Sequence, residues 1–159
     1  MMNKHNWKPY AFWIGLTLAV GGLSGFLTRE GSRIFNETVA QPPLSPPAIV
    51  FPIVWGILYT LMGISAARIR QAEPSEDQQR GINLYLIQLV LNFFWSLIFF
   101  NLRAYSLAFF WLLALWITVL LMILSFRKTD PPAAWLQIPY LLWLTFAAYL
   151  TLGVWYLNP

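Results

Sequence analysis

Apolar residues gather into five long blocks that are separated by polar stretches. The blocks cover residues 10–27, 48–67, 82–100, 104–126 and 133–157, and none of them contains Asp, Glu, Lys or Arg. Each block has about 18 to 25 residues, the length at which an α-helix crosses a hydrocarbon core about 30 Å thick. The strands of a membrane barrel would instead alternate apolar and polar residues. Because a backbone in lipid must satisfy its own hydrogen bonds, the pattern predicts an all-α membrane protein, a bundle of five transmembrane helices.

The composition agrees with this interpretation. Of the 159 residues, 58% are hydrophobic and only 10% are charged, and the mean hydropathy is +0.59. Soluble domains carry about 25% charged residues, so residues 1–159 are expected to form a single domain integral to a membrane. Lys4, His5 and Lys8 before the first block resemble the start of a secretory signal. We interpret the block as a helix, because it is longer than a typical signal core and no clean small-x-small cleavage pattern follows it.

Lysines and arginines are distributed unevenly between the two sides of the predicted bundle. Seven lie on the side of the N-terminus and three on the other: Lys4, Lys8, Arg68, Arg70, Arg80, Arg127 and Lys128 against Arg29, Arg33 and Arg103. Since cytoplasmic loops carry the excess of positive charge, this predicts an N-terminus inside and a C-terminus outside. The net charge of +4 is mostly this asymmetry, so it gives no reason to expect a nucleic-acid partner.

The connection between the first two blocks, TREGSRIFNETVAQPPLSPP, is the longest. Long connections are often functional, and this one contains apolar residues that a solvated linker would not need, among them Ile34 and Phe35. Its prolines restrict the unfolded chain and so lower the entropy that is lost when the loop becomes ordered. We expect a lid loop between helices one and two.

Prolines also mark the ends of two predicted helices. Ser45 and Asp130 are expected to cap the helices that follow, each with a proline at the first helical position. Pro52 and Pro139 are expected about two turns inside their helices, where each should bend the helix. Two bent helices could open a cavity under the lid, although prolines are generally more frequent in membrane helices than in soluble ones.

Aromatic residues at helical spacing are candidates for the wall of such a cavity. Three predicted helices carry these stripes: Phe51, Trp55 and Tyr59; Tyr85, Gln88, Asn92, Trp95, Ser96 and Phe99; Tyr140, Trp143 and Ala147. Flat apolar faces with a few amides suit a small-molecule site. Packing or an interfacial belt is the alternative for any single aromatic residue, and an interhelical hydrogen bond is the alternative for Asn92.

Some kinds of chemistry lack the residues that they need. The blocks contain no ionisable acid or base that a proton-coupled pump would require. The only histidine is His5, and cysteine does not occur, so the sequence predicts no metal site and no resident cofactor. Gly21 and Gly25 form a GxxxG pair, which more often serves packing within one bundle than a homodimer; both readings stay open.

Several longer motifs occur together along nearly the whole chain: GGLSG with REGSR, PPLSPP before PIVWGILYTLMG, QLVLNFFWSLIFFNLRAYSLAFFWLL, and PPAAWLQIPYLLWLTFAAYL. In this combination the chain resembles the TspO/MBR family, the tryptophan-rich sensory or translocator proteins of bacteria and mitochondria. The resemblance implies an integral protein of a membrane such as the bacterial cell membrane, with five transmembrane helices around a pocket that the first loop covers.

The resemblance also implies a function: a receptor or sensor that binds porphyrins, notably protoporphyrin IX, and drug-like apolar molecules. Porphyrin would be ligand or substrate, and slow light-dependent degradation would use Trp55 and Trp143 as catalytic indoles. The alternative is a transporter or a partner-regulating scaffold without chemistry. The expected ligand-binding set includes several residues of the aromatic stripes. Its members are Phe35, Pro42, Pro46, Pro47, Phe51, Trp55, Asn92, Trp95, Phe99, Trp143 and Ala147.

The chain departs from the family pattern in three places. Ile34 and Phe35 stand where the family usually has Trp-Tyr, and Leu44 stands where a second lid tryptophan is usual. Tyr156 is followed by no Lys or Arg, which the family's sterol-recognition pattern requires. The departures weaken the case for degradation and for cholesterol binding.

Overall fold

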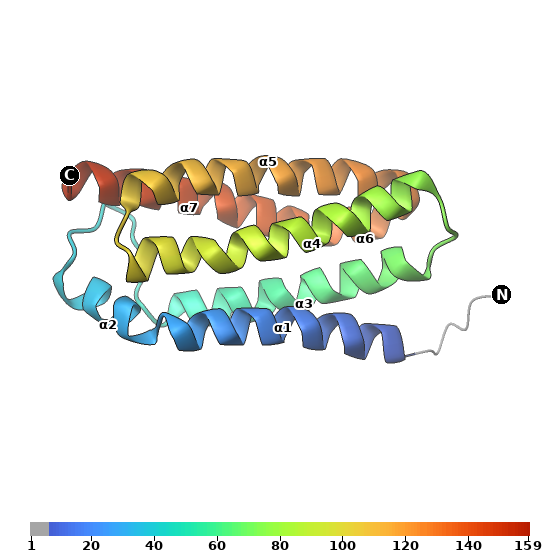
Figure 1. Ribbon diagram of the computed structural model, residues 1–159, viewed down its shortest axis with the longest axis horizontal. Helices are drawn as coiled ribbons and strands as arrows, with labels where there is room; N and C mark the ends of the chain where they lie inside the picture. Colours follow the sequence, from blue (N-terminus) through green and yellow to red (C-terminus); the bar gives the residue numbers. More distant parts are fainter. Residues whose placement is uncertain (1–6) are drawn as a thin grey trace.

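Five long helical spans run side by side along the longest axis of the molecule (Figure 1). The computed structural model describes residues 7–159; Lys4, which is predicted on the inner side, and His5, the only histidine, lie outside the described residues. The spans are α1 (Lys8–Leu27), α3 (Val50–Gln71), α4 (Glu76–Ser96) with its π-helical continuation η1 (Leu97–Asn101), α5 (Tyr105–Thr129), and α6 (Pro131–Leu136) followed by α7 (Ile138–Leu157). All five are long and apolar enough to cross a membrane, so the predicted five-helix bundle is confirmed.

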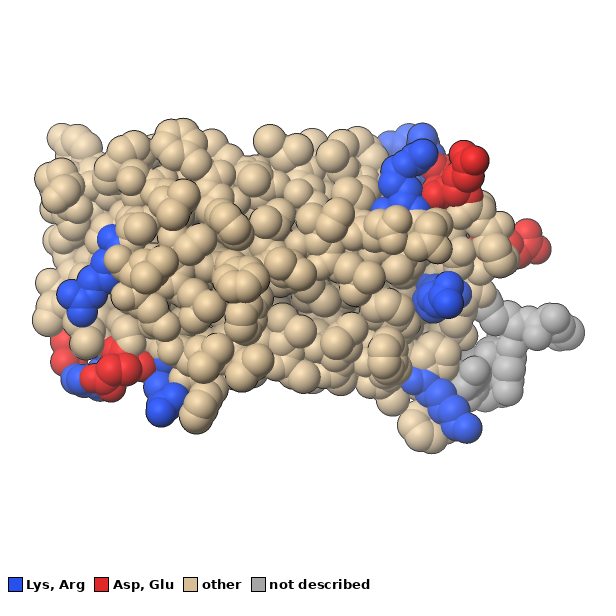
Figure 2. Space-filling view, in the orientation of Figure 1, with Lys and Arg blue, Asp and Glu red and all other residues tan. Residues whose placement is uncertain are grey.

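For the described residues, the outer surface of the bundle is apolar along its middle and charged only at its two ends, as Figure 2 shows for one face. Large side chains such as Phe110, Ile117 and Leu142 are more than half exposed. A monomer in water rarely exposes contiguous apolar surface of this kind. In a bilayer the same side chains meet hydrocarbon, which agrees with a membrane protein.

The helices extend beyond the apolar blocks by polar turns at their ends. α4 begins at Glu76 rather than near residue 82, because the Ser75 hydroxyl accepts a hydrogen bond from the Gln78 backbone N–H at 3.0 Å. Glu76 and Asp77 then place negative charge in the first turn, where it interacts favourably with the helix dipole. Hydropathy alone marks only the part of a helix that lies in lipid, so the predicted start of α4 comes about a turn and a half too late.

α1 packs closely against α3 through two glycines. A Cβ atom at Gly63 would overlap the backbone of Ile14, and one at Gly21 would overlap the Tyr59 ring. A Cβ atom at Gly25 would meet nothing within 4 Å. Of the predicted GxxxG pair, Gly21 therefore serves packing within the bundle, whereas Gly25 leaves open space beside α1.

The proline-rich entry into α3 differs from the prediction. α3 begins at Val50 rather than at Pro46, and the Ser45 hydroxyl donates to the Pro42 carbonyl at 2.7 Å instead of capping the helix. The physical reason is Pro47, whose ring disfavours the α conformation for the residue before it. Pro52 consequently lies in the first turn, where backbone N–H groups have no helical acceptor, so the predicted bend two turns inside α3 is wrong.

The second predicted bend occurs as a break in the last span. α6 ends at Leu136 and α7 begins at Ile138, with Pro139 in its first turn. Asp130 is the N-cap residue of α6, as predicted, but its side chain makes no capping hydrogen bond. The carboxylate instead pairs with Arg68 of α3, at 2.6 Å from Nε, and so ties two spans together at this end of the bundle.

The lid contains a helix that the sequence analysis did not predict. α2 (Arg29–Thr38) follows α1 almost directly and lies at the same end of the molecule as the C-terminus (Figure 1). Its Phe35 side chain is buried against the rings of Phe99 and Phe100, at centroid distances of 5.1 and 5.5 Å. A Cβ atom at Gly31 would lie 2.7 Å from the Phe100 carbonyl oxygen, so the absence of a side chain permits this close approach.

The rest of the lid, residues 39–49, is held by the end of α7. Pro42 is buried against Gly153, where a Cβ atom would lie 2.5 Å from the proline ring. Tyr149 donates a hydrogen bond to the Pro43 carbonyl at 2.6 Å, and the Asn158 amide donates to the Ala40 carbonyl at 2.8 Å. The lid is therefore fixed on both sides, by η1 and by α7.

Candidate ligand-binding cavity

A cavity of about 650 Å³ lies under the lid. Its walls come from α1, α3, the junction of α4 with η1, and α7, while residues of α2 and of the extended lid segment line the remaining side. Among the described residues that line it, none belongs to α5 or α6. The volume falls within the range of about 300–1,000 Å³ that is typical of small-molecule sites.

One wall consists of aromatic rings from α3 and α7. Trp55 and Trp143 lie edge to face, with ring centroids 6.4 Å apart and planes at 87°. Phe51 packs against Trp143 at 5.8 Å, and Tyr59 packs against Trp55 at 5.3 Å. Phe51, Trp55 and Tyr59 recur at four-residue intervals on α3, so they share one face of that helix. These contacts hold both indoles in fixed orientations beside the cavity.

A second aromatic group comes from the end of α4. Trp95 stacks on Phe99 with centroids 5.0 Å apart and planes at 18°. The π-helical turn, in which the Leu102 N–H donates to the Leu97 carbonyl at 3.0 Å, shifts the register so that both Phe99 and Phe100 line the cavity. π-Helical turns are often found at functional sites.

Small residues make room between these walls. Ala147 lies one turn beyond Trp143 on α7 and lines the cavity. Gly22 and Gly25 of α1 and Gly56 of α3 line it as well, and a Cβ atom at any of the three would meet nothing within 4 Å. The cavity therefore exists partly because these positions lack large side chains.

Asn92 lies buried beside the cavity rather than in its wall. Its amide nitrogen donates to the Tyr140 hydroxyl at 2.9 Å, and that hydroxyl donates to the side-chain amide oxygen (Oε1) of Gln88 at 2.7 Å. All three side chains are at least 97% buried. The network joins α4 to α7, which matches the interhelical role that the sequence left open for Asn92.

Most of the predicted ligand-binding residues are brought together. Seven of the eleven line the cavity: Phe35, Phe51, Trp55, Trp95, Phe99, Trp143 and Ala147. The other four do not: Asn92 and the lid prolines Pro42, Pro46 and Pro47. The lid instead contributes neighbouring polar residues such as Gln41 and Ser45. Whether any of the eleven contacts a ligand stays a prediction.

Sequence reasoning missed several lining residues, among them the glycines of α1, the polar residues of α2, and Leu150, Thr151 and Val154 of α7. A glycine has no side chain, so it does not appear in a search for stripes of aromatic residues. The signal that could have found it is its position on α1 opposite a helix with aromatic side chains, where it leaves room for a cavity. Ser32 and Asn36 lie on α2, and the sequence analysis treated that segment as loop. The spacing of four residues between them is the signal that could have found this face.

The fold and the cavity together define a class: a five-span membrane protein with an aromatic, ligand-sized cavity under a structured lid. Within that class, the chain belongs to the TspO/MBR family, whose family model matches residues 9–157. The resemblance in the sequence motifs is thereby confirmed.

Relatives in bacteria and animals match over almost the whole chain. Tryptophan-rich protein TspO of Chlorobaculum tepidum is 35% identical over 94% of this chain and 95% of its own length. Protein CrtK of Rhodobacter capsulatus is 32% identical over 89% of this chain and 88% of its own. Translocator protein of Ovis aries is 34% identical over 92% of this chain and 90% of its own.

Proposed function

We propose that this protein is a membrane receptor that binds porphyrins, such as protoporphyrin IX, and other flat apolar molecules in the cavity under the lid. The observation that carries the proposal is the pair of indoles, Trp55 and Trp143, fixed at right angles beside a space of about 650 Å³. Aromatic walls bind flat conjugated rings through stacking and edge contacts. The volume is of the size that a drug-sized ligand needs.

The proposed binding should be visible in tryptophan fluorescence. Three of the nine tryptophans, Trp55, Trp95 and Trp143, line the cavity, so a bound porphyrin should quench part of the emission. We expect quenching by protoporphyrin IX that saturates near one porphyrin per chain, measured by titration in detergent micelles. N-acetyltryptophanamide in the same micelles is the control for porphyrin that merely partitions into detergent. Quenching that rises without saturation, as in the control, would contradict the proposal.

We also propose that the lid and the cavity are on the outer side of the membrane. Lys8, Arg68, Arg70, Arg80, Arg127 and Lys128 lie at the end of the bundle away from the lid, and Arg29, Arg33 and Arg103 at the lid end. Since the positive side of a membrane protein faces the cytoplasm, reporter fusions should place the N-terminus inside and the C-terminus outside. An inverted pair of reporters would refute the orientation, and two reporters on the same side would contradict the five-span fold.

A further inference from the structure

Arg29 is the one charged residue among the described residues that line the cavity. It is the first residue of α2, at the junction of α1 with the lid. Every other described lining residue is apolar, glycine or a neutral polar residue. A single cation beside a cavity with apolar walls creates a positive end in an otherwise neutral site, and charge there selects among ligands.

Within residues 7–159, the side chain of Arg29 makes its contacts with Phe26 rather than with an acidic side chain. The guanidinium lies over the Phe26 ring, 4.0 Å from its centroid, and Nη1 donates to the Phe26 carbonyl at 2.6 Å. Among the described residues, no carboxylate forms an ion pair with it. Phe26 is 59% exposed and does not line the cavity, so these contacts hold the guanidinium at the edge of the cavity and leave its other N–H donors for a ligand.

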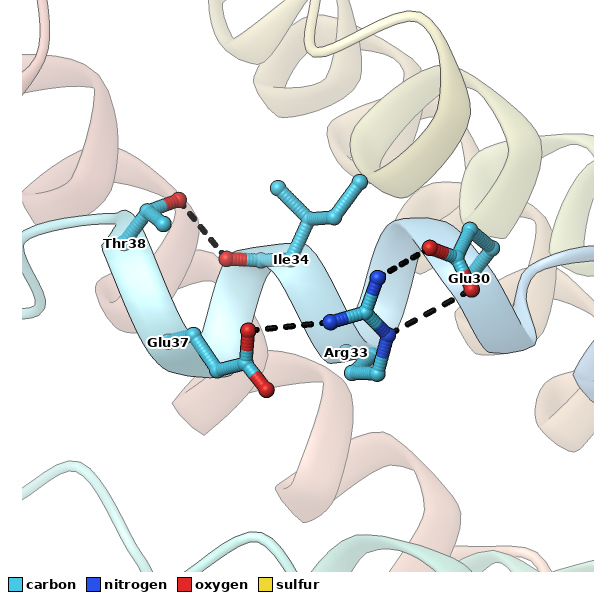
Figure 3. Close-up of polar contacts among 5 residues, drawn as sticks. All are labelled: Glu30, Arg33, Ile34, Glu37 and Thr38. Atoms are coloured by element: carbon cyan, nitrogen blue, oxygen red, sulfur yellow. Dashed lines mark hydrogen bonds and ion pairs between the residues drawn. The ribbon is translucent and has the colours of Figure 1, made fainter.

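The neighbouring arginine shows the contrast. Arg33 bridges Glu30 and Glu37 on the exposed face of α2, with 3.0 Å between Nη1 and the Glu37 carboxylate (Figure 3). The hydrogen bond and charge of Arg33 are the main causes that lower the pKa of the Glu30 carboxyl group, and the charge of Arg29 lowers it further. Glu30, although adjacent to Arg29 in the chain, is thus engaged by Arg33. Of the two arginines of α2, only Arg29 lines the cavity.

Two neutral donors accompany Arg29 on the same face of α2. Ser32 and Asn36 follow it at three and seven residues, and both line the cavity. This spacing places the three side chains on one side of the helix. A hydroxyl and an amide can each donate a hydrogen bond to an anion that the guanidinium holds.

We infer that Arg29 is the anion-binding residue of this cavity, and that the cavity selects flat apolar molecules that carry a carboxylate, with the carboxylate at the α2 end. This inference deepens the proposed function and rests on it, since the carboxylate of a porphyrin would be the group that Arg29 binds. Guanidinium and carboxylate form charge-assisted hydrogen bonds, frequently in pairs. The apolar body of the ligand would lie against the aromatic walls.

The test compares protoporphyrin IX with its dimethyl ester, which has the same macrocycle but no carboxylate. In Arg29→Gln, we expect the affinity for the free acid to fall by about 10-fold or more, as for the loss of one hydrogen bond to a charged group. The affinity for the diester should stay unchanged, which also shows that the variant is folded. Arg33→Gln is the matched control, because Arg33 is on the same helix outside the cavity, and it should change neither affinity.

The outcomes separate this inference from the proposed function. If the wild type binds both compounds and Arg29→Gln binds the free acid as tightly as before, or loses both equally, the assignment of Arg29 is overturned while the receptor function stands. If the wild type binds neither compound, the proposed function fails and the inference fails with it. A loss confined to the free acid, restored in part by Arg29→Lys, supports the anion site.

Discussion

Ala147→Leu should weaken porphyrin binding by about 5- to 150-fold, which corresponds to about 1–3 kcal/mol for the cost of overpacking a filled site. Ala147 lines the cavity one turn beyond Trp143 and is 7% exposed. A leucine side chain there would extend into the space beside the indoles. The dissociation constant from the quenching titration measures the effect directly.

A second variant narrows the cavity from the opposite wall without disturbing the packing of the bundle. Gly25 of α1 lines the cavity, and a Cβ atom there would meet nothing within 4 Å. Gly25→Leu should therefore weaken binding by a similar factor while the protein stays folded. This variant keeps the prediction testable if Ala147→Leu destabilises α7.

Each variant has a matched control. Gly15→Leu makes the same change on α1 at a position that also has nothing within 4 Å but does not line the cavity. Ala114→Leu makes the alanine change on the exposed side of α5. Both controls should bind as the wild type does. If Ala147→Leu and Gly25→Leu both bind normally in folded protein, the porphyrin site lies elsewhere.

The five-span fold could be predicted because lipid leaves few alternatives for an apolar chain. A block such as residues 104–126 fixes the existence of a helix and its approximate length, and the structure has α5 at Tyr105–Thr129. Ends of helices follow other rules. The Ser75 cap decides where α4 begins through one hydrogen bond, and the Pro46-Pro47 pair decides where α3 begins through one steric clash. Mean hydropathy does not register either of these local effects.

The candidate site was predictable where side chains repeat and not where they are absent. Four residues separate Trp55 from Tyr59 on α3, and the same spacing separates Trp143 from Ala147 on α7. Each pair therefore lies on one helix face, and that face lines the cavity. Gly25 contributes by having no side chain, which a search for stripes cannot register. Asn92 satisfied the same spacing but turned toward Tyr140, because a buried amide gains more from a hydrogen-bond partner than from an apolar space.

The last prediction concerns chemistry under light: the protein–porphyrin complex should convert porphyrin to an open-chain product when illuminated in oxygen. An excited porphyrin can take one electron from an adjacent indole, which leaves a porphyrin radical anion and an indole radical cation. Oxygen is the oxidant: one O₂ adds across a carbon–carbon double bond of the macrocycle, both oxygen atoms end as carbonyls, and the electron returns to the indole. The ligand supplies this reactivity, while the protein supplies orientation and exclusion of water.

Trp55 and Trp143 are the indoles placed for this role, since both line the cavity and their ring centroids are 6.4 Å apart. Trp55→Phe or Trp143→Phe keeps an aromatic ring but removes an electron-rich donor, so binding should persist while conversion falls to the bleaching rate of free porphyrin in detergent. The porphyrin absorption band measures both binding and conversion. Binding is followed by the shift of the band in the dark, and conversion by its loss and the growth of a product band under light. Trp135→Phe is the control, because Trp135 is 73% exposed on α6 and does not line the cavity. Equal bleaching in the wild type and in both cavity variants would leave stacking as the only role of these indoles and would make the protein a binding module.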